Sequence, residues 1–124
     1  MALILVLDDV REAAIVIQKI LQKRAHTVHV FTDEEEAISF TRDNTVDLAI
    51  LDIKLRKMEG IEVLAEMKKY QPSMQVIMLT GHPTIAAKQQ SLQLGAAAFC
   101  AKPIDKTELE TVVADLLGKA DHKA

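Results

Sequence analysis

Acidic, hydroxyl and amine side chains stand directly after short apolar runs in four parts of the chain. Asp8 and Asp9 follow the first run, Asp52 follows a later one, and Thr80 and Lys102 come after two others. Clustered carboxylates repel one another, so ionising all three requires a compensating cation. Such oxygen ligands suit Mg²⁺ better than zinc, which favours histidine and cysteine. An ammonium and a hydroxyl opposite the metal can bind a dianion such as a phosphoryl group.

Asp52 is the candidate nucleophile in this set. It stands alone after the apolar run 48–51, which is typical of a central strand, whereas the pair Asp8 and Asp9 is better suited to supporting a metal. An aspartate can attack phosphorus and form an aspartyl phosphate. This reaction needs positioning and charge neutralisation, which a metal and Lys102 would supply. Each residue alone is better explained as a helix cap or a surface charge, and only their joint placement favours a site.

Five strand-length aliphatic runs must position these residues. The runs are Leu3–Leu7, Thr27–Phe31, Val46–Leu51, Val76–Leu79 and Ala97–Ala101. The stretches between them are long enough for helical crossovers between parallel strands. We therefore expect an α/β fold with a parallel sheet and helices on both faces. In such a sheet the carboxyl ends of the strands share one edge, and ligands bind outside that edge.

Helical signals fill the intervening stretches. Helices are expected from Arg11 to about Arg24, from the N-cap Asp33 onward, and over Glu59–Tyr70 and Thr84–Leu94. Three glutamates after Asp33 form an acidic first turn that the helix dipole favours. The last helix has one apolar stripe, formed by Leu109, Val112, Val113, Leu116 and Leu117. Residues 1–118 are expected to be one domain, and residues 119–124 an unstructured polar tail or the start of a linker.

Composition restricts the class of protein. The 124 residues suffice for one domain, and 49% hydrophobic with 27% charged residues is typical of a soluble globular protein. The formal net charge of −3 leaves no basic surplus for nucleic acid. The first apolar run is too short to span a membrane or to be a signal-peptide core. The single cysteine, Cys100, gives no reason to expect an oxidising compartment, and a cytoplasmic location is expected.

From about Leu3 to Leu117 the chain resembles the receiver domain of two-component response regulators, of the chemotaxis-regulator type. The resemblance rests on Asp8-Asp9, Leu51-Asp52, Leu79-Thr80-Gly81 and the segment from Phe99 to Lys102-Pro103. It implies a flavodoxin-like, doubly wound sheet of strand order 2-1-3-4-5 with five helices on two faces. It also implies a cis peptide bond before Pro103 that directs Lys102 into the site.

By the same resemblance, Asp52 accepts a phosphoryl group from a sensor histidine kinase. Mg²⁺ is bound by Asp9, Asp52 and the backbone carbonyl of Lys54, with Asp8 assisting through water. The domain is then a phosphoacceptor that catalyses only its own phosphotransfer and dephosphorylation. Thr80 and Phe99 act as switch residues that shift the face formed by the fourth helix, fifth strand and fifth helix. That face controls an output domain or a downstream protein, and a homodimer can form through it.

The chain departs from the family pattern at a few positions. Arg56 stands where proline is common, so the loop from Ile53 to Gly60 is expected to be more mobile or to turn differently. Lys54 and His82, two residues beyond Asp52 and Thr80, occupy positions that in the family flank the approach of water and tune the lifetime of the phosphate. Phe99 lacks the hydroxyl of a tyrosine, and simple core packing is an equally good interpretation of it. Thr80 could likewise be a plain turn residue.

Other functions are considered beside the receiver. A small Mg²⁺-dependent phosphatase usually has a second acid two residues after the nucleophile, where this chain has Lys54. A flavin carrier would need a Ser/Thr/Gly-rich loop after the first strand, where Asp8 and Asp9 stand. The alternative that stays open is a receiver-like interaction module that does not use phosphate. Whether the domain is stand-alone or part of a longer regulator, and which kinase serves it, also stay open.

Overall fold

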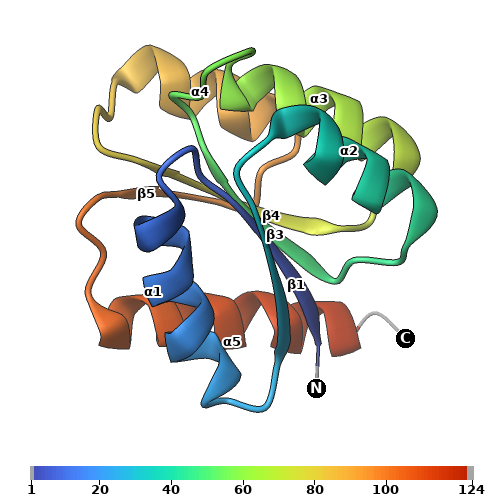
Figure 1. Cartoon of the computed structure of the whole chain (residues 1–124), viewed down its shortest axis with the longest axis vertical. Coiled ribbons are helices and arrows are strands. Elements are labelled where there is room, and N and C mark those ends of the chain that lie inside the picture. Colours follow the sequence, from blue (N-terminus) through green and yellow to red (C-terminus); the bar gives the residue numbers. More distant parts are fainter. Residues whose placement is uncertain (1, 123–124) are drawn as a thin grey trace.

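Strands and helices alternate strictly along the chain. The computed structural model describes residues 2–122 and, for residues 2–118, the side chains as well (Figure 1). The strands are β1 (Leu3–Leu7), β2 (Thr27–Phe31), β3 (Leu48–Asp52), β4 (Gln75–Thr80) and β5 (Ala98–Ala101). The helices are α1 (Arg11–Gln22), α2 (Glu34–Asp43), α3 (Gly60–Tyr70), α4 (Ile85–Gln93) and α5 (Lys106–His122).

The five strands form one parallel sheet in the order β2-β1-β3-β4-β5. The predicted fold class and strand order are therefore confirmed. The register aligns the strand ends: Asp52 pairs with Leu79, and Thr80 pairs with Ala101. Consequently β1, β3, β4 and β5 all end at the same edge of the sheet.

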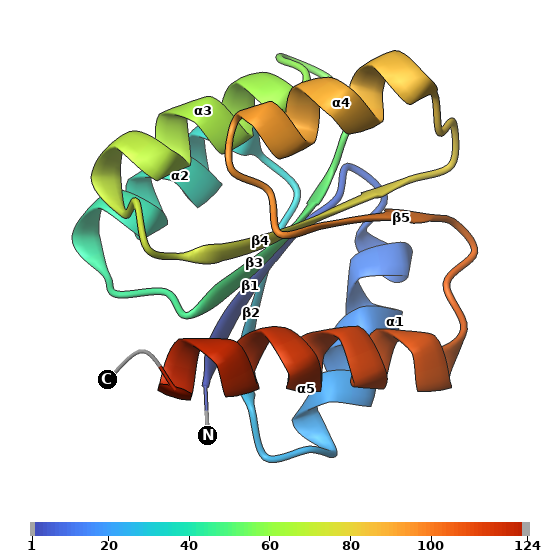
Figure 2. The same ribbon diagram turned by 180° about the vertical axis from the view of Figure 1, so that it is seen from behind.

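Helices cover both faces of the sheet. Figures 1 and 2 show α1 and α5 on one face and α2, α3 and α4 on the other. Each strand supplies both layers by alternation: Leu48 and Ile50 of β3 belong to the core under α1 and α5, whereas Ala49 and Leu51 belong to the core under α2 and α3. Because both faces are buried, the central strands are continuous apolar runs.

Side-chain caps fix where several helices begin. The predicted N-cap Asp33 accepts a hydrogen bond from the backbone N–H of Glu36 at 3.0 Å. Thr84 caps α4 by accepting from the N–H of Ala87, also at 3.0 Å. Glu59 and Glu62 form a reciprocal capping box at the start of α3. Two residues predicted as first helical positions, Glu59 and Thr84, are thus caps.

Several predicted boundaries differ from the structure by a few residues, and two of these differences have an identifiable physical cause. The third strand begins at Leu48 and not at Val46, because the N–H of Val46 donates to the side chain of Gln71 at 2.8 Å. The predicted unstructured tail is wrong for residues 119–122, because α5 continues to His122 through residues that contain no proline. Residues 123 and 124 lie outside the described part of the chain. Among the helices of residues 2–122, none has the length and apolar character needed to cross a membrane.

Candidate functional site

The residues predicted to carry chemistry meet at the carboxyl edge of the sheet. Asp8 and Asp9 directly follow β1, Asp52 ends β3, Thr80 ends β4, and Lys102 directly follows β5. The strand order places these four strands side by side. The sheet therefore brings together side chains that are as far apart in the chain as Asp8 and Lys102.

Three carboxylates form the centre of the site. One oxygen from each of Asp8, Asp9 and Asp52 lies within 4.8 Å of the others. Asp8 is 2% exposed and Asp52 is 8% exposed, while Asp9 is half-buried and open to solvent. The N–H of Val10 donates to Asp8 at 2.9 Å and fixes the orientation of that carboxyl group. This cluster of hard oxygen ligands can bind a metal ion.

Lys102 joins two of the three carboxylates. Its Nζ donates to Oδ2 of Asp8 at 2.6 Å and to Oδ2 of Asp52 at 3.0 Å. Burial alone would lower the pKa of Lys102, but the hydrogen bonds and charges of Asp8 and Asp52 outweigh it, so that the pKa is raised. The Lys102–Pro103 peptide bond is cis, as the resemblance implies. Lys102 therefore stays charged and contributes one positive charge against three carboxylates.

Asp52 is in an unusual environment for a carboxylate. Burial raises its pKa above the ordinary 3.8, the hydrogen bond and charge of Lys102 oppose this, and the nearby charge of Asp8 adds to it. The backbone N–H of Lys54 also donates to Oδ1 of Asp52, at 3.3 Å. Because the effect of burial is the largest, the pKa of Asp52 is raised and its ionised form is disfavoured. A bound cation would stabilise the ionised form.

Thr80 and Phe99 lie on the neighbouring strands β4 and β5. Thr80 is fully buried, its Oγ1 accepts from the N–H of His82 at 3.0 Å, and its carbonyl accepts from the N–H of Lys102 at 2.7 Å. Phe99 is half-buried and packs against the core under α2, α3 and α4. Lys54 and His82 take part through their backbone N–H groups, and their side chains are exposed.

Two further residues, Gly60 and Glu34, contact the backbone of Asp52 or of the loop that follows it, and neither was predicted from the sequence to do so. Gly60 approaches β3 so closely that a Cβ atom would lie 1.9 Å from the carbonyl oxygen of Asp52. Glu34 is 1% exposed and accepts hydrogen bonds from the N–H groups of Lys57 and Met58 in the loop after β3. The close approach of Gly60 could have been predicted, because an isolated glycine after a loop often marks a place where two backbone segments meet. Nothing in the sequence separates Glu34 from the two glutamates that follow it.

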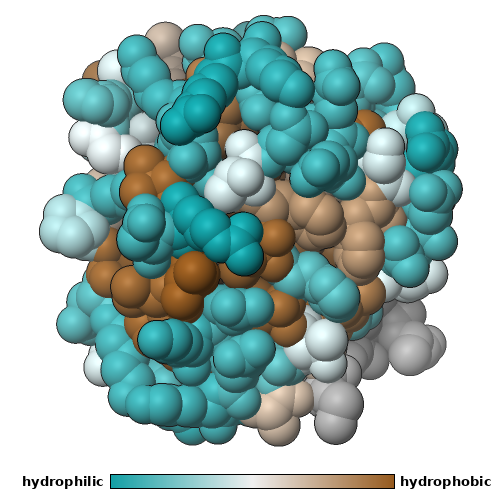
Figure 3. Space-filling model, in the orientation of Figure 1, coloured by the Kyte–Doolittle hydropathy of each residue, from teal (hydrophilic) through white to brown (hydrophobic). Residues whose placement is uncertain are grey.

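An apolar pocket lies next to the cluster. It is lined by Ala13, Val16 and Ile17 of α1 and by Pro103 and Ile104 after β5, with Lys102 at its border. Figure 3 shows apolar atoms gathered on this face of the molecule. Val16 is 58% exposed, which is unusual for a residue of this type. The charged site therefore has an apolar surface beside it.

Comparisons with known proteins agree with this geometry. The family model of the response regulator receiver domain matches residues 4–114. A CheY-like response regulator receiver domain protein from Methanospirillum hungatei JF-1 has a TM-score of 0.97 and 28% identity, over 100% of this chain and 99% of that one. Sporulation initiation phosphotransferase F of Bacillus subtilis (strain 168) is 30% identical over 110 residues, 89% of each chain.

A third comparison concerns a chemically modified relative. A response regulator protein from Burkholderia pseudomallei, solved with a phosphorylated aspartic acid, a calcium ion and citrate, has a TM-score of 0.86 and 25% identity, over 98% of this chain and 70% of that one. The chain spans only 22–26% of the length of the first curated relatives, which are transcriptional regulatory proteins. The family match covers most of the chain, and the acidic cluster lies at the strand ends. This chain therefore belongs to the response regulator receiver domains, the phosphoacceptor domains of two-component signalling.

Proposed function

We propose that this receiver domain stores a signal as a phosphoryl group on Asp52, delivered by a sensor histidine kinase. The observation that carries the proposal is the position of Lys102, whose Nζ contacts both Asp8 and Asp52 within a cluster of three carboxylates. A cation held at an oxygen-rich nucleophile is the arrangement that phosphoryl transfer requires. The Burkholderia pseudomallei relative, which holds a phosphorylated aspartic acid and a calcium ion, supports the same chemistry.

The residues at the site fit Mg²⁺. Asp9 and Asp52 offer carboxylate oxygens as direct ligands, the backbone carbonyl of Lys54 is the third ligand that we assign, and Asp8 acts through water. Mg²⁺ uses few protein carboxylates and keeps several waters, and the partial exposure of Asp9 would leave room for water at the site. The ion would neutralise charge on the carboxylates and on the incoming phosphoryl group.

The chain's own residues carry out the transfer. A carboxylate oxygen of Asp52 attacks the phosphorus of the kinase phosphohistidine, a P–O bond forms, and the P–N bond breaks with its electron pair returning to the histidine ring. Lys102 shifts its hydrogen bond from Asp52 to a phosphoryl oxygen, and Thr80 turns its hydroxyl to donate to another. Asp8 keeps hold of the ammonium during this exchange. Positioning and charge neutralisation lower the barrier, and no separate base is needed.

The side chains of Lys54 and His82 set the lifetime of the phosphate. Both side chains are exposed, and each stands two residues beyond a residue of the site, so we expect them to flank the approach of a hydrolytic water. We expect Lys54→Ala to change the rate at which phosphorylated protein decays, whereas an unchanged rate would refute the role of Lys54.

The switch links Thr80 and Phe99 to the face formed by α4, β5 and α5. Movement of the Thr80 hydroxyl toward the phosphoryl group opens space into which Phe99, now half-buried on the neighbouring strand, turns further inward. Phosphate acts by favouring one of two packings of this face. The face controls an output domain, a downstream protein or a second copy of the domain. Comparing phosphate-dependent NMR shifts in Thr80→Ala and wild type tests this role, and an unchanged response would refute it.

The phosphodonor approaches over the apolar pocket between α1 and the segment after β5. This surface borders Lys102, which contacts Asp52, and Figure 3 shows apolar residues gathered on this face. Large exposed apolar patches are typical of surfaces for protein partners. The net charge of −3 gives no basis for direct nucleic acid binding by this domain.

Intact-mass analysis tests the central proposal. Wild type and Asp52→Asn are incubated with acetyl phosphate, with Mg²⁺ and with a chelator. We expect one phosphoryl group to be added to wild type, only with Mg²⁺, and none to be added to the variant. Metal binding without phosphorylation of wild type would instead support the interaction module that does not use phosphate.

A further inference from the structure

Glu34 is a buried carboxyl group outside the cluster of acidic residues. It is the first residue of α2 and is 1% exposed, whereas Glu35 and Glu36 in the same turn are exposed. A buried carboxylate is stable only where hydrogen bonds replace the lost water. Its burial therefore requires partners, and these lie in another part of the chain.

Those partners belong to the loop that follows Asp52. Oε2 of Glu34 accepts from the N–H of Lys57 at 2.5 Å and from the N–H of Met58 at 2.9 Å. Beside it, Nζ of Lys57 donates to Oδ1 of the N-cap Asp33 at 2.6 Å. Asp33 and Glu34 thus hold Lys57 and Met58, and we call these four residues the Glu34 latch.

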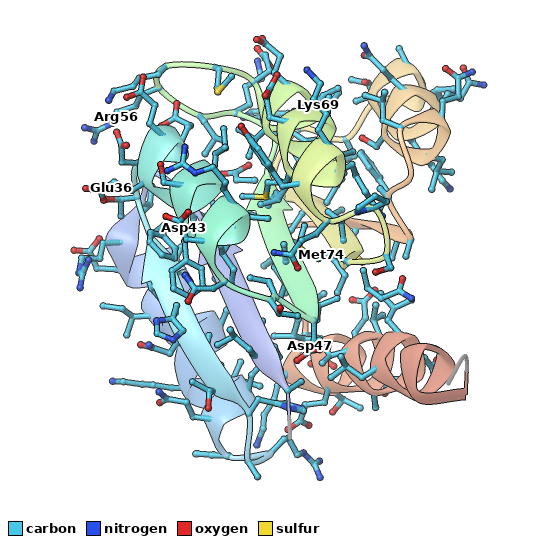
Figure 4. The ribbon with its side chains drawn as sticks, turned by 90° about the vertical axis from the view of Figure 1, so that its right-hand side faces the viewer. Glu36, Asp43, Asp47, Arg56, Lys69 and Met74 are labelled. Carbon is cyan, nitrogen blue, oxygen red and sulfur yellow. The ribbon has the colours of Figure 1, made fainter. Side chains whose placement is uncertain are left out.

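The latch holds a segment that has little regular structure of its own. Residues 53–59 form neither helix nor strand, and Arg56 stands where the family commonly restricts the backbone with proline. Figure 4 shows Arg56 above the first turn of α2, near Glu36. Hydrogen bonds from an adjacent helix can restrict such a loop in place of a proline ring. Here the latch provides them.

The loop is also bonded directly to the phosphoacceptor. The N–H of Lys54 donates to Asp52, and the N–H of Gly60 donates to the carbonyl of Ile53 at 2.7 Å, which closes the loop at its base. The latch fixes the far side of the same loop. The backbone around Lys54 is therefore held at the base by β3 and at the tip by α2.

We propose that Glu34 is a positioning residue for the metal site, acting through the loop backbone on the carbonyl of Lys54. The inference rests on the proposed function, because it assigns that carbonyl as a metal ligand. Oε2 of Glu34 accepts both backbone hydrogen bonds, so the reach of this side chain should matter more than its charge, although the charge also acts on Lys57. Groups that orient metal ligands typically change metal affinity by about 10–100-fold when they are lost.

Two substitutions separate reach from charge. Glu34→Asp keeps the charge and the preference for a helix N-terminus but withdraws the oxygens by one methylene group. Glu34→Gln keeps an oxygen at the same reach and removes the charge. Glu35→Ala, in the same turn but exposed, is the matched control. For each protein we would measure the Kd of Mg²⁺ by NMR titration, the phosphorylation by acetyl phosphate, and the hydrogen exchange of the Lys57 and Met58 amides.

We expect Glu34→Asp to weaken Mg²⁺ binding by about tenfold, the lower end for an orienting group, and to speed exchange of the two amides. Glu34→Gln and Glu35→Ala should stay within about twofold of wild type, well below that effect. Faster amide exchange with unchanged Mg²⁺ affinity in Glu34→Asp would overturn the inference, and so would equal losses in Glu34→Asp and Glu34→Gln. Wild type that binds no Mg²⁺ would instead refute the proposed function.

Discussion

Gly60 is the position at which α3 begins against the backbone that carries Asp52. An added Cβ atom would lie 1.9 Å from the Asp52 carbonyl oxygen, a distance that only movement of the backbone could relieve. We expect Gly60→Ala to lower the free energy of unfolding by about 2–3 kcal/mol, as overpacking does, measured by urea unfolding. Gly118→Ala is the matched control, because a Cβ there has no neighbour within 4 Å. Equal effects of the two substitutions would contradict the prediction.

The raised pKa of Asp52 makes stability depend on pH. Above the ordinary pKa of 3.8 the folded state binds more protons at this group than the unfolded state does. The contribution to stability is therefore present below pH 3.8 and is lost as the pH rises through the higher pKa of the folded state. At neutral pH the ionised Asp52 lowers the stability of the metal-free protein.

We therefore expect Asp52→Asn to be more stable than wild type at pH 7 in the presence of a chelator. The difference should shrink as the pH falls toward 4, because wild-type Asp52 then takes up its proton. Urea unfolding at several pH values measures this. The exposed Asp115→Asn serves as control. A difference that is independent of pH would rule out the burial of Asp52 as its cause.

Residues that act through their own type and spacing could be predicted from the sequence. Asp8, Asp9, Asp52, Thr80 and Lys102 follow apolar runs, and parallel strands must bring such positions to one edge. Glu34 could not be predicted, because its partners are backbone N–H groups 23 and 24 residues away. Gln71 is a similar case, since it accepts from Val46 and donates to the carbonyls of Thr41 and Asn44. The amino-acid sequence does not indicate which backbone N–H or carbonyl group a side chain will contact.

At the scale of elements, α4 buries fewer of its described residues than α2 and α3, the other helices on its face of the sheet. Ser91 is its one fully buried residue among those described, and its hydroxyl has no hydrogen-bond partner among the described side chains. An unsatisfied buried hydroxyl costs free energy, and Ile85 on the same helix is 78% exposed. The small number of buried residues and the unsatisfied hydroxyl favour a helix that can change its packing, as the proposed switch requires of α4.

We expect Ser91→Ala to raise the free energy of unfolding by about 1 kcal/mol, the lower end for a buried unsatisfied group. The gain should be accompanied by slower hydrogen exchange in α4. Gln90 is exposed on the same helix, so Gln90→Ala is the control that measures the effect of helix propensity alone. If Ser91→Ala stabilises no more than Gln90→Ala does, the unsatisfied hydroxyl has no energetic role.

Element boundaries were predictable where a side chain marks them. Asp33 caps its helix as the sequence predicts, and strands β1 and β2 have the predicted bounds. Boundaries set by tertiary contacts were not predictable. Val46 is not part of β3, because its N–H donates to the side chain of Gln71. The helix α5 continues past its expected end, because no proline interrupts it.

For the whole molecule, metal binding and folding should be linked. A ligand that binds only the folded state stabilises it, by about 2.7 kcal/mol at one hundred times its Kd. We expect Mg²⁺ to have this effect on wild type, and a chelator to remove it. Asp9→Asn should lose most of this Mg²⁺-dependent stabilisation. Of the three aspartates, Asp9 is the one whose replacement should disturb the metal-free cluster least, because Lys102 pairs with Asp8 and Asp52.

Thermal or urea unfolding with and without Mg²⁺ measures this linkage. Asp115→Asn should keep the full gain, because Asp115 lies on the exposed side of α5. A full gain in Asp9→Asn would mean that Mg²⁺ binds elsewhere on the folded protein.

The pairing of Asp8 with Lys102 also determines when the site can exist. These residues are 94 positions apart, and the ammonium belongs to the segment after the last strand. A chain leaving the ribosome presents Asp8, Asp9 and Asp52 long before Lys102 is made. Until then the carboxylates have no ammonium beside them, and the strand that positions it is missing. The carboxylate cluster therefore gains its ammonium only after β5 has been made, so that a chain ending before Lys102 carries the three acidic residues without the cation that neutralises them.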